Sequence, residues 1–309
     1  MIFKKGALAF FLPIILVIAG CAPVRTTKEP TLLESAVIAR EEGIRAYDGE
    51  DYEGALYKFK EALVLDRSME NLEGEITDLV NMGRALVYLG RHDESLSFLN
   101  GALKLSFELK DEARLSSTYA ALAMTHFQMR NYDAALKDID ESISIDRRLG
   151  RFEGRALNLM ALIYIESGRL TEASRVLDAA LGENKKAGDP AATADTYRAL
   201  ARLMARKNMV EEGIIYFNKA YALDKTHGSF RKMARDLRGM AGLHIRRGRY
   251  NDAVVLLKRS YAVHMHGGFA GAASVDIDRL IGVYEKMGDR EKVVYYTTLK
   301  KGIMADIEK

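Results

Sequence analysis

Three arginines stand four residues apart, about two thirds of the way along the chain. Arg198, Arg202 and Arg206 stand at i, i+4 and i+8, a spacing that places all three on one face of an α-helix. Guanidinium groups bind carboxylates through paired hydrogen bonds, and like charges this close repel one another unless anions lie beside them. The pattern therefore indicates either a site for an acidic ligand or a solvated charged face that is neutralised by internal salt bridges.

The chain has no group of residues with the spacing of a catalytic or metal site. It holds no G-x-x-x-x-G-K-[ST] loop and no G-x-S-x-G elbow, and its single cysteine is Cys21. His264 and His266 are two residues apart, which on a helix directs them to different faces, whereas metal-binding pairs stand at i and i+4. We therefore expect no enzymatic activity, no metal and no cofactor.

The elements that must position the arginines repeat along the chain. Tyr197, Leu200, Ala201 and Met204 form the apolar stripe of a half-buried helix, and a second stripe follows a turn around Asn208. Small residues recur at steps of 40 residues, with one step of 38, and such a period is the signature of a stacked repeat array. The three columns are Gly43, Gly83, Ala123, Ala161, Ala201, Ala241 and Ile281; Ala55, Ser95, Ala135, Ala173, Gly213, Ala253 and Val293; and Ala62, Ala102, Ser142, Ala180, Ala220, Ser260 and Lys300.

This pattern resembles that of the tetratricopeptide (TPR) repeat, whose unit has small residues at positions 8, 20 and 27 and a large apolar residue at position 24. The resemblance covers roughly residues 36–309, and turns such as GEDYEGAL at 49–56 also fit. The period is longer than the usual 34 residues, which is typical of the long-helix variant; a HEAT-type array shares the period but not the pattern. The resemblance implies an all-α, right-handed superhelical solenoid of about seven TPR-like helix pairs.

In that family the first helix of each unit lines a concave groove that binds protein segments. Carried over position by position, the groove falls on apolar side chains in the third and fourth units and on arginines in the fifth and sixth. The resemblance thus implies a protein or peptide partner that is acidic or offers a free C-terminal carboxylate. The predicted groove residues are Met124, Phe127, Leu162, Ile165, Arg198, Arg202, Arg206, Arg235, Arg238 and Arg246.

The first twenty residues have the features of a bacterial lipoprotein signal peptide. Two lysines precede an apolar stretch over 6–18, which is shorter than the roughly 20 residues of a membrane-spanning helix. The sequence IAGC at 18–21 resembles a lipobox, which implies removal of residues 1–20 and acylation of Cys21. An ordinary signal peptide or an uncleaved anchor is the alternative. Ala22 after the cysteine favours the outer membrane, facing the periplasm.

Residues 21–30 are then the lipidated cysteine and a short tether, and residues 31–309 the solenoid. Thr31 and Glu34 have the spacing of a capping box that opens the first helix. The chain has 46 Lys and Arg against 43 Asp and Glu, so it lacks the excess of basic residues that nucleic-acid binding requires.

Together these features predict a lipid-anchored scaffold or adaptor of the bacterial cell envelope. Its membrane contact is the N-terminal lipid, and its partner is a protein or peptide in the groove of the array. Two other functions fit the same features. One is an assembly or pilot factor of an envelope machine such as a pilus, a secretin or an outer-membrane complex. The other is a non-catalytic regulator of a cell-wall enzyme.

Overall fold

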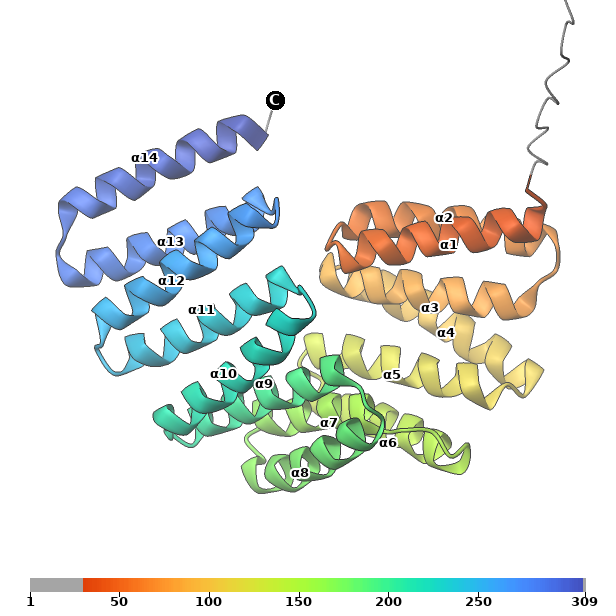
Figure 1. Ribbon diagram of the computed structural model, residues 1–309. Coiled ribbons are helices and arrows are strands. Elements are labelled where there is room, and N and C mark those ends of the chain that lie inside the picture. The colour runs from red at the N-terminus through yellow and green to blue at the C-terminus, as the bar shows by residue number, and fades with distance from the viewer. Residues whose placement is uncertain (1–29, 308–309) are drawn as a thin grey trace, which may run out of the picture.

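The computed structural model describes residues 30–307, so the predicted signal peptide, Cys21 and most of the tether lie outside the described residues. Within them every regular element is a helix, and the helices follow one another in pairs round an arc (Figure 1). The prediction of an all-α superhelical repeat array of seven pairs is confirmed. The helices are α1 (Leu32–Asp48), α2 (Tyr52–Ser68), α3 (Leu72–Tyr88), α4 (His92–Leu109), α5 (Glu112–Gln128), α6 (Tyr132–Arg148), α7 (Gly154–Glu166), α8 (Leu170–Lys186), α9 (Pro190–Arg206), α10 (Val210–Thr226), α11 (Phe230–Arg246), α12 (Tyr250–His266), α13 (Ala270–Met287) and α14 (Arg290–Ile307).

The columns of small residues lie where the two helices of a pair approach each other. In each of the three columns the first six members are buried and the seventh, in the last pair, is only half-buried. Gly83 shows the physical reason, because a Cβ atom at this position would lie 2.6 Å from Cγ of Leu99 on the partner helix. A larger residue there would force Leu99 out of its packed position. The predicted role of the small residues is confirmed.

The helix ends follow local signals in the sequence. The hydroxyl of Thr31 accepts a hydrogen bond from the backbone N–H of Glu34 (3.2 Å), and the Glu34 carboxylate accepts one from the N–H of Thr31 (2.7 Å). This is the predicted capping box, which satisfies two N–H groups that have no partner within the helix. After the C-terminal ends of α8 and α10, Gly188 and Gly228 have φ values of +62° and +65°. Glycine adopts this conformation without steric strain.

The fourth pair departs from the others at its first helix. The corresponding helices α5 and α9 begin eleven residues before their small residues Ala123 and Ala201, whereas α7 begins seven residues before Ala161. Residues 151–153 precede α7 without regular structure. The 38-residue step shortens the sequence by two residues, and α7 starts four residues, or about one helical turn, later than α5 and α9 do relative to their small residues.

The core is a succession of apolar clusters, each shared by neighbouring pairs. The first joins Phe59 of α2, Leu99 of α4 and Leu122 of α5, and the next joins Ile139 of α6 to Ile163 of α7. Each pair thus covers the apolar face of its neighbour, which is how a stacked array is stabilised. Among the described helices, none is both long enough and apolar enough to cross a membrane.

The curvature of the array brings its first pair close to its sixth. Glu50 lies in the turn between α1 and α2, and its carboxylate is 3.0 Å from the guanidinium of Arg231 and 3.7 Å from that of Arg235, both on α11. The Arg231 guanidinium also lies 4.0 Å from the ring centroid of Phe269. The two contacts of Glu50 connect units that are far apart in the sequence across the opening of the arc.

Candidate functional site on the inner surface

The odd-numbered helices form the inner side of the arc. Helix α3 packs on α5, α5 on α7, and α7 on α9. Within residues 30–307, even-numbered helices of neighbouring pairs make no comparable contact. The first helices of neighbouring pairs thus lie closer together than the second helices do. This difference in spacing curves the array around the first helices. The predicted groove residues all lie on these inner helices, from α5 to α11.

The structure corrects the prediction for Arg198. Its side chain is only 5% exposed, and its Nε donates a hydrogen bond of 2.7 Å to Asp236 of α11. Its terminal nitrogens donate to Asp224 of α10 and to Asp195. A guanidinium that is buried among three carboxylates has no free face for a ligand, so Arg198 joins the fifth pair to the sixth instead.

The same arrangement occurs at the start of the array. Arg40 of α1 donates through Nε to Asp78 of α3 (2.6 Å) and through a terminal nitrogen to Asp66 of α2. In both places the carboxylates stand 26 and 38 residues after the arginine. This spacing, visible in the sequence, is a signal that the sequence reasoning missed. Burial raises the pKa of Asp78 to about 7, against the opposing effect of Arg40.

The sixth pair has a variant of this junction. Arg238 of α11 lies 3.8 Å from Asp276 of α13, and His264 replaces the first aspartate at the same 26-residue spacing. His264 is buried and its Nδ1 is 2.6 Å from Asp276, while His266 is exposed. The prediction that these two histidines face different ways is confirmed. Within residues 30–307 no cluster of three or more potential metal ligands is found.

Among the remaining predicted arginines, three have partners within the protein and one does not. Arg206 pairs with Glu166 of α7, Arg235 lies near Glu50, and Arg246 donates a 3.0 Å hydrogen bond to the carbonyl oxygen of Ala205. Arg202 has no ion pair or hydrogen bond with any described residue. Its side chain is exposed, yet the surrounding protein partly desolvates it and lowers the pKa of its guanidinium. Internal salt bridges thus neutralise most of this surface and leave Arg202 open.

The predicted apolar groove residues also differ from one another in exposure. Met124, Phe127 and Leu162 are half-buried on the inner helices. Phe127 lines a pocket of about 320 Å³ together with Arg206 and other residues. Ile165, by contrast, is 0% exposed and belongs to the core between the fourth and fifth pairs. The prediction of a groove position is therefore corrected for Ile165, whose side chain is directed into the helix pair rather than toward the hollow.

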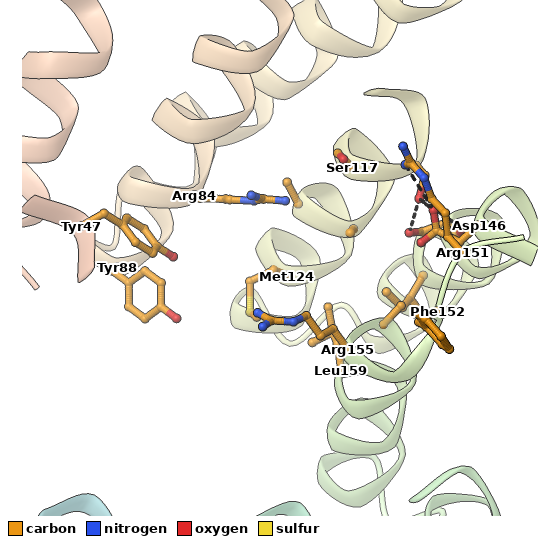
Figure 2. Close-up of a pocket in the computed structure, with 16 residues that line it drawn as sticks. Tyr47, Arg84, Tyr88, Ser117, Met124, Asp146, Arg151, Phe152, Arg155 and Leu159 are labelled. Carbon is orange, nitrogen blue, oxygen red and sulfur yellow. Dashed lines mark hydrogen bonds and ion pairs between the residues drawn. The ribbon is translucent and has the colours of Figure 1, made fainter. Parts of the chain in front are cut away.

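A second pocket of about 380 Å³ lies on the inner surface of the first four pairs (Figure 2). Of the predicted residues it contains only Met124, because the pattern that predicts the groove points mainly to the arginines of the fifth and sixth pairs. Arg84 reaches toward the pocket from α3, with Tyr47 and Tyr88 on one side and Phe152 on the other (Figure 2). The lining residues are Tyr47, Arg84, Tyr88, Ser116, Ser117, Ala120, Ala121, Met124, Ile139, Ser142, Asp146, Arg151, Phe152, Arg155, Ala156 and Leu159.

Positively charged side chains outnumber negatively charged ones around this pocket. Arg84 is half-buried and has no hydrogen bond or ion pair with any described residue, and burial lowers the pKa of its guanidinium. The carboxylate Asp146 is already engaged, since it accepts a 2.8 Å hydrogen bond from Ser116 and lies 3.8 Å from Arg151. Arg155 pairs with Asp189 at 2.7 Å. The pocket is therefore electropositive, with one cation that lacks a counter-ion.

Comparison with known proteins finds a known repeat in two segments of the chain. Profiles of the family described as tetratricopeptide repeat match residues 75–148 and 154–186. The DnaJ homolog subfamily C member 7 homolog of Dictyostelium discoideum is 24% identical over 121 residues, which are 39% of this chain and 21% of that protein. The chain therefore spans about a fifth of the length of that relative.

Solved structures share the fold at low sequence identity. A signal transduction ATPase with a tetratricopeptide repeat sensor from Pyrococcus horikoshii has a TM-score of 0.60 at 18% identity, over 87% of this chain and 42% of that one. Aspartyl phosphate phosphatase F from Bacillus subtilis has a TM-score of 0.62 at 13% identity, over 88% and 71% of the two chains. A Rap protein complexed with Competence and Sporulation Factor has a TM-score of 0.61 at 14% identity, over 89% and 78%.

These likenesses concern the fold, which is generally a non-catalytic scaffold for protein interactions. Two matched segments lie within the seven helix pairs, and the same columns of small residues continue through the unmatched first, fifth and sixth pairs. The chain is accordingly a tetratricopeptide repeat protein, with a scaffold suited to protein binding.

Proposed function

We propose that the protein is a lipid-anchored scaffold of the bacterial cell envelope that binds an acidic segment of a partner protein on its inner surface. The observation that carries the proposal is the pair of inner-surface guanidiniums, Arg84 and Arg202, that have no carboxylate partner among the described residues. Both have a lowered pKa because the protein partly desolvates them. A ligand carboxylate would restore the interaction that each cation lost with water.

The apolar surroundings of these cations also favour a peptide ligand. Half-buried Met124 lies in the same pocket as Arg84, and half-buried Phe127 lies with Arg206 in the neighbouring one. A segment with alternating acidic and apolar side chains would match both features. The Rap protein was crystallised with Competence and Sporulation Factor, and its similar fold supports ligand binding by an array of this curvature.

The anchor is the second part of the proposal. The motif IAGC at 18–21 supplies the cysteine, and a diacylglyceryl group with an amide-linked acyl chain would bury enough methylene groups for stable attachment. Since α1 begins at Leu32, only about ten residues separate the lipid from the array. The lipid would hold the scaffold near the membrane surface, and the inner surface would recruit the partner there.

Reversing the charge of Arg202 is expected to weaken partner binding by about tenfold or more, because a lost ion pair becomes a repulsion. The measurement is in-cell crosslinking followed by quantitative mass spectrometry of the captured proteins. Arg202→Glu is compared with Arg175→Glu, which reverses an exposed arginine on the outer helix α8. Identical partners and yields from wild type and Arg202→Glu would contradict the proposed site.

Replacing Cys21 with serine is expected to abolish acylation and to move the protein from the membrane fraction to the soluble fraction. The serine hydroxyl is not a substrate for thioether formation, so the prediction concerns the thiol rather than the size of the side chain. Metabolic labelling with a radioactive fatty acid and fractionation provide the measurement. Retained label in Cys21→Ser would disprove lipidation at this residue while leaving the groove unaffected.

A further inference from the structure

The shortened start of α7 creates a feature that the other described pairs lack. Because α7 begins about one turn late, residues 151–153 have irregular backbone at repeat positions that belong to the first helical turn in α5 and α9. Arg151 and Phe152 of this segment line the pocket of about 380 Å³, together with Arg155 and Ala156 of the first turn of α7. The pocket therefore lies at the place where the chain departs from the regular repeat.

The pocket is lined by both apolar and charged side chains. Its apolar lining includes Ala120, Met124 and Leu159. Arg84 reaches toward the space from the opposite side, without a carboxylate partner among the described residues (Figure 2). The lining also includes the exposed ring of Phe152. Such a combination suits an apolar group that carries an anion beside it.

The volume of the pocket limits the size of the group that it can hold. A dry cavity of about 150 Å³ holds one benzene molecule, so about 380 Å³ accommodates one large side chain together with part of its backbone. A long apolar surface would not match, because the lining also includes charged and hydroxyl groups. The engaged carboxylate of Asp146 leaves the unpaired cation as the dominant charge.

We propose that this pocket is the specificity-determining subsite of the inner surface: it receives one large apolar side chain of the bound segment, and Arg84 binds the carboxylate of an adjacent Asp or Glu. The inference rests on the proposed function, since it presupposes that a protein segment binds the inner surface. It adds that the pocket between the first four pairs, rather than the arginine-rich fifth and sixth pairs, selects which segment is bound.

The test uses a random pool of short amidated peptides and the full chain purified in detergent. Arg84→Gln removes the charge but keeps a polar side chain, and Ala156→Leu fills the pocket without changing any charge. The matched control is Ala262→Leu, at an exposed position of the outer helix α12. Thermal unfolding of each variant establishes that it is folded before the peptides are compared.

Wild type is expected to enrich peptides in which a large apolar residue adjoins Asp or Glu. Arg84→Gln should weaken the binding of these peptides about tenfold and abolish the preference for the acidic neighbour. Ala156→Leu should abolish the preference for the large apolar residue, and Ala262→Leu should behave as wild type.

The inference and the proposed function fail in different ways. If both pocket variants enrich the same peptides as wild type while Arg202→Glu loses them, an acidic segment binds the inner surface outside this pocket and the inference is wrong. If wild type enriches no acidic peptide at all, the proposed function is wrong as well. Binding of acetate or inorganic phosphate to Arg84 without any enrichment of apolar residues would show an anion site only and would also overturn the subsite.

Discussion

Arg198→Met is expected to destabilise the array by about 3–5 kcal/mol, because removing one partner of a buried ion pair leaves uncompensated charge. The substitution keeps the length of the side chain but strands Asp224 and Asp236, which are both buried at the junction of the fifth and sixth pairs. Urea denaturation followed by circular dichroism gives the free energy of unfolding. Hydrogen exchange of α9 to α11 would place the loss at this junction.

Arg202→Met is the matched control, one helical turn further along α9. Arg202 is exposed and has no partner among the described residues, so its replacement should change the free energy of unfolding by no more than about 0.5 kcal/mol. Equal effects of the two substitutions would contradict the structural role of Arg198. The contrast also matters for function, since loss of binding in an Arg198 variant would report unfolding rather than a lost ligand contact.

The array is expected to be more stable at pH 5 than at pH 8, by about 3 kcal/mol from Asp78 alone. Burial raises the pKa of Asp78 to about 7 in the folded protein, whereas an unfolded Asp titrates near 3.9. The folded state therefore holds a proton that the unfolded state has released between about pH 4 and 7. Stability must fall as pH rises through that window and level off above it.

A second buried aspartate contributes with the same sign. Burial raises the pKa of Asp236 to about 6, against the attraction of Arg198, so its contribution is lost at lower pH than that of Asp78. Both groups share their junctions with an arginine and another aspartate, Asp66 or Asp224. Burial of each carboxylate outweighs the attraction of its arginine, which is the physical reason for proton uptake.

Asp78→Asn provides the test, because the amide imitates the protonated carboxyl. We expect this variant to lose most of the difference in stability between pH 5 and pH 8, measured by urea denaturation at each pH. Asp93→Asn on the exposed surface of α4 is the control and should keep the wild-type pH dependence. A wild-type protein that became more stable between pH 5 and pH 8, or an Asp78→Asn variant with an unchanged slope, would refute the assignment.

The repeat and its boundaries could be predicted because they depend on neighbours in the sequence. The capping box of Thr31 and Glu34 involves residues three positions apart, and the left-handed turn at Gly228 requires only that residue's own freedom. The small residues were informative because each pair repeats the same close approach. Gly83 against Leu99 is a contact within a single pair.

The inner surface was harder to predict because its charges meet across pairs. Family positions placed Arg198 and Ile165 in the groove, but the structure buries both. The partners of Arg198 come from α10 and α11, and only the stacking of the fifth pair on the sixth brings them to it. The 26- and 38-residue spacing to its aspartates was present in the sequence, but spacing alone does not distinguish a solvated face from a buried junction.

The sequence determined the class of fold, the number of helix pairs and the start of the first helix, since periodic packing and local capping act over a few residues or a single pair. Only the tertiary structure decided which arginines are neutralised and where the surface is hollow. Arg202 and Arg84 differ from Arg198 in lacking carboxylate partners among the described residues, and the late start of α7 coincides with a pocket. Charge pairing and cavity shape depend on distances between residues of different pairs, and the curvature of the whole array sets those distances.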